Sequence, residues 1–496
     1  MSEVRRTDWQ QRVDSMANDG LRVLGIAWRP LEKLPEKVGP EIERELELIG
    51  LIGILDPARP EAKVAVERAC EAGIRTIMIT GDHVLTAEAI ARDLGIIRET
   101  DKAITGSELD DLSADELERA ARQTSCFARV SPAHKLRLVQ VLQNQNNIVA
   151  MTGDGVNDAP ALKQADIGVA MGITGADVSK GASEMILTDD NFRSIVAAIE
   201  EGRAIYDNIK KFIKYMLSSN VGEILVMFVA LLIHLPIPLL AIQILWINLV
   251  TDGLPAIALG FEPAEKGVMR RRPRPTNESI FAGGAGIHIV LVGVLIAILT
   301  LISYVWGYST IGLDGFEPSL GLEQLDRQSV AELAGAEAVP AAWDDWSADA
   351  RVAFLGANES EAAGFLEEHE GVKDPGRRLL AQAERIPRTI AFTVLAFTQM
   401  FQVVAIHAGD RTTFWQAGFK GNPLMFWAVL STFALQLIVI YMPFFQSLFD
   451  TAALGLTHVV ASVAAGILVL FFVEIEKLFF RRFLKLDASA TAPATT

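Results

Sequence analysis

The sequence predicts an α/β domain with a doubly wound parallel sheet, followed by an all-α domain of six transmembrane helices. The chain has 496 residues, half of them apolar, which is long for one domain and apolar for a soluble protein. Apolar residues gather after Phe212, whereas residues 1–203 mix charged and apolar side chains. Between residues 46 and 190, short apolar runs alternate with helical patterns, which is typical of strand–helix–strand units.

The α/β domain is expected over residues 46–191, with its strands where the apolar runs fall. These runs cover residues 49–55, 74–80, 126–130, 148–152, 167–170 and 185–187. Helical patterns lie between them at residues 61–72, 86–93, 133–143 and 157–164. Ligands of open parallel sheets bind outside the carboxyl ends of the strands, so polar residues that follow these runs are the first candidates for a site.

A stalk helix is expected over residues 192–211, because the helical pattern continues past Lys211 and Lys214 into an apolar stretch without a breaker. The membrane domain, residues 212–480, contains six stretches close to the roughly 20 residues that span a bilayer. They cover residues 212–234, 239–259, 284–306, 390–408, 423–441 and 454–473. The chain is therefore expected to be a multi-pass integral protein of the lipid bilayer.

Basic clusters predict the orientation of these spans. Lys210-Lys211, Arg270 to Arg274, and Lys477 with Arg481-Arg482 all fall on one side of an even number of spans, which the positive-inside rule makes the cytoplasm. The N-terminal domain and the tail at 481–496 are then cytoplasmic, and the acidic loop at 307–388 is extracytoplasmic. The first residues are polar and unlike a secretory signal. A formal charge of −16 argues against a nucleic-acid partner.

Two of the apolar runs end in similar polar clusters, and both lie where a parallel sheet places its ligand site. The clusters are Thr80-Gly81-Asp82 and Thr152-Gly153-Asp154-Gly155-Val156-Asn157-Asp158. Glycines let backbone N–H groups approach a phosphate, a threonine adds a donor, and a carboxylate can hold Mg²⁺. Lys135, at the start of a later helix, can supply a compensating positive charge. Each cluster alone is a weak signal, since a single Thr-Gly-Asp is usually a turn after a strand.

Four motifs together carry a resemblance to a known family. They are Asp56-Pro-Ala-Arg59, Met78-Ile-Thr-Gly-Asp82, Ser131-Pro-Ala-His-Lys135 and Thr152-Gly-Asp-Gly-Val-Asn-Asp-Ala-Pro-Ala-Leu-Lys163. In type and order they resemble the phosphorylation-domain motifs of P-type ATPases, a domain with the haloacid-dehalogenase fold. The opening residues, 19–27, resemble the end of that family's nucleotide-binding domain, so residues 1–45 are expected to belong to it.

The resemblance implies a role for each residue of the motifs, with Mg²⁺ and ATP as cofactors. It makes Asp154 the Mg²⁺ ligand, with Asp158 as a second candidate. The residues implied in phosphoryl chemistry are Thr80, Gly81, Asp82, Lys135, Asn157, Asp158 and Asp56. Those implied in cofactor binding are Arg59, Arg129, Thr152 and Gly153.

Two membrane segments contain polar residues that are costly at membrane depth. Asn220 and Glu223 are three residues apart on one helical face, and Asn248, Thr251 and Asp252 precede the helix breakers Gly253 and Pro255. Ionisable groups in a span are candidates for an ion site, and a broken helix frees carbonyls to coordinate ions. Polar residues that only hold helices together are a credible alternative for Asn220 alone.

These segments resemble the fifth and sixth transmembrane helices of reticulum-type calcium pumps, which implies that the five residues hold the transported cation. Gln399 stands where those pumps carry a glutamate in the eighth helix. A neutral amide lowers the negative charge of the site, which puts a stoichiometry of two ions in doubt.

The motifs Asp-Lys-Thr-Gly-Thr and Thr-Gly-Glu, which the family uses for phosphorylation and dephosphorylation, are absent from the 496 residues. The near match at residues 101–106 has the wrong spacing and is expected to be a surface loop. We therefore expect a partial pump, inactive alone. A truncated gene, a partial sequence and a split gene remain open, and a split gene requires a separate chain that supplies the N-terminal half.

The leading hypothesis is an ATPase that works through an aspartyl phosphate and moves Ca²⁺ out of the cytoplasm. Oxygen ligands without sulfur or imidazole disfavour Cu⁺ and Zn²⁺, while Mn²⁺, Na⁺ and H⁺ remain open. The alternative from another class is a catalytically silent membrane protein that binds cations or a partner. A phosphatase fused to an unrelated membrane anchor is disfavoured, because both halves resemble the same family.

Overall fold

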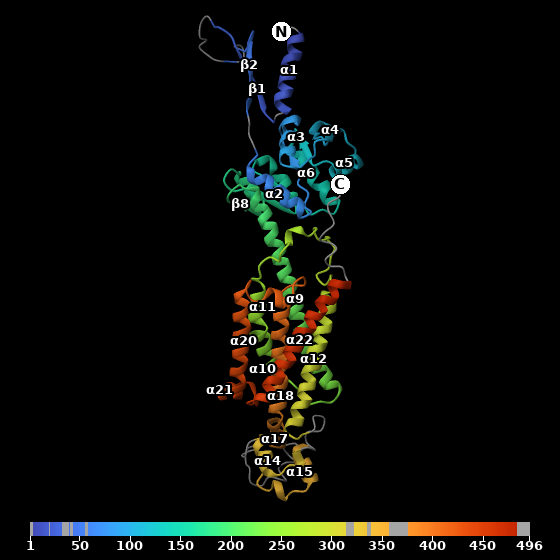
Figure 1. Cartoon of the computed structure of the whole chain (residues 1–496), viewed down its shortest axis with the longest axis vertical. Helices are drawn as coiled ribbons and strands as arrows, with labels where there is room; N and C mark the ends of the chain where they lie inside the picture. The colour runs from blue at the N-terminus through green and yellow to red at the C-terminus, as the bar shows by residue number, and fades with distance from the viewer. Residues whose placement is uncertain are drawn as a thin grey trace. The chain divides into compact units, whose positions relative to one another are not determined.

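The computed structural model describes residues 3–18, 20–31, 39, 43–54, 58–313, 322–334, 339–356 and 375–483 (Figure 1). The chain forms two compact units. The first contains residues 1–202 and 266–278, and the second contains residues 203–265 and 279–488.

The strands of the α/β region are parallel and form two sheets of three strands each. The first sheet has the order β3 (Met78–Ile79), β5 (Cys126–Ala128), β4 (Ile104–Thr105), and the second has the order β6 (Ala150–Gly153), β7 (Ile167–Met171), β8 (Met185–Leu187). The predicted parallel class is confirmed. The sequence indicated one sheet because apolar runs reveal strands but not which strands are neighbours.

Helices connect these strands, as the alternating pattern predicts. They are α2 (Pro60–Glu71), α3 (Val84–Asp93), α4 (Gly106–Asp111), α5 (Ala114–Gln123), α6 (Pro132–Asn144), α7 (Ala159–Gln164) after the 3₁₀ turn η2 (Val156–Asp158), and α8 (Asp177–Ala182). The helix α1 (Glu3–Asn18) precedes them. Helices α4 and α5 begin with capping boxes at Thr105 and Ser113, each of which pairs with a glutamate three residues on. We did not expect these two helices, although the capping boxes are visible in the sequence.

Two expectations for this unit are wrong. The run at 49–55 is not a strand of the parallel sheets: β2 (Glu47–Ile54) pairs antiparallel with β1 (Arg22–Trp28), from Arg22 opposite Ile54 to Trp28 opposite Glu47. Consecutive strands are usually neighbours in a sheet, and β2 pairs with the strand that precedes it along the chain. Residues 101–106 are not wholly a loop, because Ile104 and Thr105 form β4, which the half-buried Ile104 anchors.

The second unit contains the six predicted spans, each a helix long and apolar enough to cross a membrane. They are α9 (Phe192–Leu232), the segment Ala241–Leu259, α12 (Ala285–Thr310), α18 (Arg385–His407), α20 (Pro423–Tyr441) and α22 (Leu456–Phe483). The stalk and the first span form one uninterrupted helix of 41 residues, as the missing breaker predicts. The second span is α10 (Ala241–Trp246), a π-helical turn η3 (Ile247–Thr251) and α11 (Gly253–Leu259).

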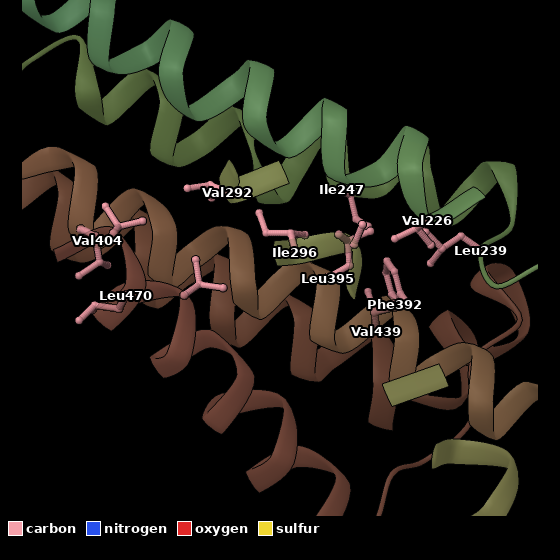
Figure 2. Packing of buried hydrophobic residues seen from close by; sticks show 14 of the residues in the cluster. Val226, Leu239, Ile247, Val292, Ile296, Phe392, Leu395, Val404, Val439 and Leu470 are labelled. Atoms are coloured by element: carbon pink, nitrogen blue, oxygen red, sulfur yellow. The ribbon is translucent and has the colours of Figure 1, made fainter. Parts of the chain in front are cut away.

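The core of this unit lies around α18. Of the apolar stretch of this helix, 94% is buried. Val226 of α9, Ile247 of η3, Ile296 of α12, Phe392 of α18 and Val439 of α20 converge there, as Figure 2 shows. An all-round buried helix is held in place by its neighbours on every side. Side chains that α18 directs inward are therefore fixed relative to α9 and η3.

The region between the third and fourth spans is partly helical, with α14 (Arg327–Ala334), α15 (Ala348–Gly356) and α17 (Pro375–Ala383). Trp343 is fully buried in its core, together with Tyr304 and Tyr308 of α12. The short helices α19 (Phe414–Ala417) and α21 (Pro443–Phe449) lie in the later connections.

Candidate functional site

The first cluster lies at the carboxyl end of β3. Thr80 Oγ1 donates to Asp82 Oδ2 at 2.8 Å and accepts from the Asp82 backbone N–H at 3.1 Å. Gly81 and Asp82 are exposed. The polar groups of this turn therefore face solvent at the edge where a parallel sheet binds its ligand.

The second cluster follows β6 and is built around Asp158, which is buried. Its Oδ1 accepts from Lys135 Nζ at 2.5 Å, and its Oδ2 accepts from the Gly155 backbone N–H at 3.2 Å. A Cβ at Gly153 would lie 2.5 Å from the Asp158 Cβ, so only glycine fits there. The ion pair joins α6, which follows the first sheet, to the turn after the second.

A Mg²⁺ ion fits Asp154 better than Asp158 in this arrangement. Both carboxylate oxygens of Asp158 already have partners, one of them cationic. Asp154 and Asn157 are exposed, and Asp154 uses its backbone carbonyl, not its carboxylate, to accept from Ala176. No group of three metal-binding side chains gathers in the described part of the chain. Mg²⁺ commonly takes one or two carboxylates and completes its shell with water and substrate phosphates.

The remaining predicted residues of this region have structural contacts of other kinds. Arg59 Nη1 donates to the Asp190 carbonyl at 2.8 Å, and thus binds the turn before α9. Arg129 has a left-handed backbone (φ 50°), and its backbone N–H donates to the Asp82 carbonyl at 3.2 Å. Thr152 and Gly153 pair with β7. Asp56 lies outside the described residues.

Two of the predicted cation residues, Asn248 and Gln399, contact a third, Glu223, which is buried on α9. Its Oε2 accepts from Asn248 Nδ2 at 2.7 Å, and its Oε1 accepts from Gln399 Nε2 at 3.0 Å. Three helical segments, α9, η3 and α18, therefore supply side chains to one site.

Asp252 lies at the end of the π-helical turn and is completely buried. Its backbone N–H donates to the Ile247 carbonyl at 2.9 Å, and Thr251 Oγ1 donates to the same carbonyl at 2.8 Å. Asp252 Oδ1 accepts from Tyr215 OH at 2.8 Å. The extra residue of the π turn rotates Asp252 relative to a regular helix, which is how such turns commonly place functional groups.

Several oxygens of this region are buried without a hydrogen-bond partner among the described residues. They are Asp252 Oδ2, Gln399 Oε1, Gln402 Oε1 and Ser219 Oγ. An unpaired buried oxygen costs about 1–3 kcal/mol, so such groups usually serve a ligand. Uncharged and anionic oxygens are the ligands that a hard cation prefers. Asn220 makes no hydrogen bond to this group in the part of the chain that the structure covers.

Comparison with known proteins identifies a family for each region of the chain. Residues 4–166 match the family of haloacid dehalogenase-like hydrolases, and residues 236–479 match the family described as cation transporting ATPase, C-terminus. The chain belongs to the cation-transporting P-type ATPases. The hydrolase match contains both polar clusters, and the membrane match contains η3 and α18, whereas α9 with Glu223 precedes the membrane match.

Relatives of this chain include calcium-transporting ATPases from bacteria and eukaryotes. A calcium-transporting ATPase of Bacillus subtilis is 51% identical over 307 residues, which is 62% of this chain and 34% of the relative. The endoplasmic reticulum calcium ATPase srcA of Aspergillus fumigatus is 46% identical over 60% of this chain and 32% of its own length. An endoplasmic reticulum-type calcium-transporting ATPase of Arabidopsis thaliana is 44% identical over 61% of this chain and 31% of its own length. The chain thus spans about a third of the length of these curated relatives.

Three residues of the membrane site were not predicted from the sequence: Tyr215, Ser218 and Gln402. Tyr215 donates to Asp252, and Gln402 Nε2 donates to Ser218 Oγ. Gln402 follows Gln399 by three residues, so it lies on the same face of α18, and this spacing was the available signal. Tyr215 gave no such signal, because it is one helical turn outside the polar motif.

Proposed function

We propose that this chain forms the phosphorylation-domain and transport part of a pump that exports Ca²⁺ from the cytoplasm at the expense of ATP. The observation that carries the proposal is the oxygen-lined site of Glu223, Asn248, Asp252 and Gln399. Two carboxylates and several neutral oxygens meet the preference of Ca²⁺ for six to eight oxygen ligands. The calcium pumps among the relatives support the same ion.

The hydrogen bonds of the site explain how it can bind and release a cation. Asn248 and Gln399 each donate an N–H to Glu223, and each also carries an amide oxygen. A bound cation would attract these oxygens and Asp252 Oδ2, and displace the N–H groups from Glu223. When the ion has left, these hydrogen bonds hold the Glu223 carboxylate. They lower the free-energy cost of a buried carboxylate that has no cation beside it.

The phosphorylation region would supply phosphate-binding groups and a metal ligand. Thr80, Gly81 and Asn157 lie at the open ends of the strands, and Lys135 brings a positive charge to Asp158, the residue after Asn157. Asp154 would hold a Mg²⁺ ion, which neutralises phosphoryl charge when it is bound. We propose that the phosphorylated aspartate lies outside these 496 residues, on a preceding segment or a separate chain. We further propose that the first unit and the C-terminus are cytoplasmic, as the basic clusters suggest.

Phosphorylation of a full-length pump that contains this chain tests the proposal. We expect labelled ATP to give an acid-stable phosphoenzyme that requires micromolar Ca²⁺. Asp252→Asn should abolish the Ca²⁺-dependent formation of the phosphoenzyme, because it removes one of the two carboxylates identified in the site. Asp349→Asn, at an exposed position of helix α15, is the matched control and should behave like the wild type.

Three outcomes would contradict the proposal or a part of it. Retention of wild-type Ca²⁺ dependence in Asp252→Asn would remove the aspartate from the transport site. Phosphorylation that follows Na⁺ or Mn²⁺ and ignores Ca²⁺ would keep the pump but change its ion. A full-length protein that never forms a phosphoenzyme would favour a silent cation-binding protein.

A further inference from the structure

Asp190 lies in the turn between β8 and α9 and is 8% exposed. Its Oδ1 accepts from the backbone N–H groups of Gly172 at 2.7 Å and Ile173 at 3.0 Å. Its Oδ2 accepts from the backbone N–H and the hydroxyl of Thr174, each at 2.8 Å. Four donors therefore converge on one carboxylate, and charge-assisted bonds of this kind are among the stronger ones.

The loop that Asp190 holds begins at the end of β7 and reaches the second polar cluster. The Ala176 backbone N–H donates to the Asp154 carbonyl at 2.8 Å. Ser179 Oγ donates to the Gly155 carbonyl at 2.7 Å. Residues 172–179 thus connect Asp190 to the segment that carries the candidate Mg²⁺ ligand. A Cβ at Gly172 would lie 2.4 Å from the Leu187 carbonyl oxygen, so this loop has little room to shift.

The other side of Asp190 leads into α9. Arg59 Nη1 donates to its carbonyl, and α9 begins two residues later at Phe192. The first turns of α9 pack through Val196 against the apolar residues of α2, and Arg68 of α2 forms an ion pair with Glu200 at 3.0 Å. The start of this helix is therefore fixed to the same framework as the loop.

We propose that Asp190 is a positioning residue that couples the loop beside Asp154 to the start of α9. It contacts neither of the polar clusters with its side chain and acts through residues 172–174. A displacement of the Asp154 segment would be passed through this clamp to α9, which continues as one helix to Glu223. The role rests on the proposed pump function, since it is the coupling of phosphorylation to transport that the clamp would serve.

The variant Asp190→Asn in the full-length pump tests the clamp. The amide has one acceptor oxygen, and its NH₂ group would face the donors of Thr174, so about half of the bonds are lost. Asparagine tolerates the left-handed backbone at this position (φ 48°), so the variant adds no backbone strain. We expect Ca²⁺-dependent phosphorylation to persist. The number of Ca²⁺ ions transported per ATP hydrolysed should fall about fivefold or more, because coupling between two sites is typically of that size and would be lost.

Asp189→Asn is the matched control. Asp189 is exposed, and among the described residues its carboxylate bonds the Asn191 backbone and Ser194 at the start of α9 and no group of the loop. We expect the wild-type transport ratio for this variant. Thr174→Ala, which removes one of the four donors, should give an intermediate ratio and replaces Asp190→Asn if that variant does not fold.

Hydrogen exchange of the 496-residue chain provides a second measurement. Asp190→Asn should accelerate exchange at the amides of Gly172, Ile173 and Thr174 and leave helix α5 unchanged. A working wild-type pump whose Asp190→Asn and Thr174→Ala variants keep the wild-type transport ratio would overturn the clamp alone. A wild-type protein without Ca²⁺-dependent phosphorylation would overturn the pump and the coupling role together.

Discussion

At the scale of single residues, carboxylate side chains of this chain differ in burial and in hydrogen-bond partners, and therefore in the roles they can have. Asp158 is buried and paired with Lys135, whereas Asp154, four residues earlier, is exposed and available to a metal. In the membrane unit, Glu223 has both oxygens bonded, and Asp252 keeps one buried oxygen without a partner. The identity of a residue therefore does not decide its role; the partners that the fold brings to it do.

The two cysteines provide a test of burial in the first unit. Burial raises the pKa of the Cys126 thiol to about 11, and its side chain is completely buried in β5, whereas Cys70 on α2 is exposed. The thiolate is the reactive form, so Cys126 should be almost unreactive at pH 8. We expect a thiol reagent to label Cys70 in the folded chain and Cys126 only in denaturant, as mass spectrometry of the peptides would show. Equal labelling rates in the folded chain would contradict the position of β5.

The site residues show how far the sequence could lead. Glu223, Asn248, Asp252 and Gln399 were predictable, because polar groups in apolar spans stand out by their cost. The role of Arg59 was not, because its guanidinium binds a backbone carbonyl 131 residues away in sequence. Tyr215 was also missed, since a tyrosine in a membrane helix is ordinary until its hydroxyl is seen to reach Asp252. Contacts distant in sequence leave no local pattern.

At the scale of elements, the spans were predictable and their irregularities were only partly so. A stretch of about 20 apolar residues fixes the existence of a membrane helix almost alone. The breakers Gly253 and Pro255 predicted a disturbance in the second span, but the π-helical turn lies before them, at Ile247–Thr251. The packing of α9 against α12 could not be predicted, because two apolar helices offer many equivalent contacts.

Glycines set the distance between α9 and α12. A Cβ at Gly293 of α12 would lie 2.6 Å from Val221 Cγ1, whereas a Cβ at Gly286 of the same helix would have 3.6 Å to its nearest neighbour. Gly293→Ala should therefore overpack the contact and cost about 1–3 kcal/mol. Because α9 carries Glu223, the apparent affinity for Ca²⁺ should fall as well.

Gly286→Ala is the control within the same helix. Alanine favours a helix by about 1 kcal/mol over glycine, so this variant should be neutral or slightly stabilising. Thermal unfolding in detergent of the two variants beside the wild type would measure the difference. If Gly293→Ala melts at or above the temperature of Gly286→Ala, the close approach of α9 and α12 is wrong.

At the scale of the whole molecule, the chain combines two units that serve one proposed cycle. The first unit contains a parallel α/β framework with two polar turns that we propose bind phosphate, and the second contains an oxygen-lined site within six spans. Parallel alternation and span length predicted both classes of unit. The division of the strands between two sheets was not predictable, since it depends on which strands meet and not on their own composition.

The composition of the two units leads to a prediction for the 496-residue chain by itself. Covalent catalysis through a phosphoenzyme requires a nucleophile, and metal and phosphate ligands cannot replace it. Among the described residues of the two polar clusters, the exposed carboxylates are Asp82 and Asp154, and Asp82 accepts a hydrogen bond from Thr80. The family motif Asp-Lys-Thr-Gly-Thr does not occur in the 496 residues.

We therefore expect the purified chain to form no phosphoenzyme when it is incubated with labelled ATP and Mg²⁺. Addition of a second chain that carries the Asp-Lys-Thr-Gly-Thr motif should restore labelling, and the label should reside on the added chain. Hydroxylamine sensitivity would identify an acyl phosphate, and an Asp154→Asn variant of this chain should suppress the restored labelling by removing the Mg²⁺ ligand. An acid-stable, hydroxylamine-sensitive label on the 496-residue chain would show that one of its own carboxylates is the nucleophile, and Asp82 and Asp154 would then be the first to test.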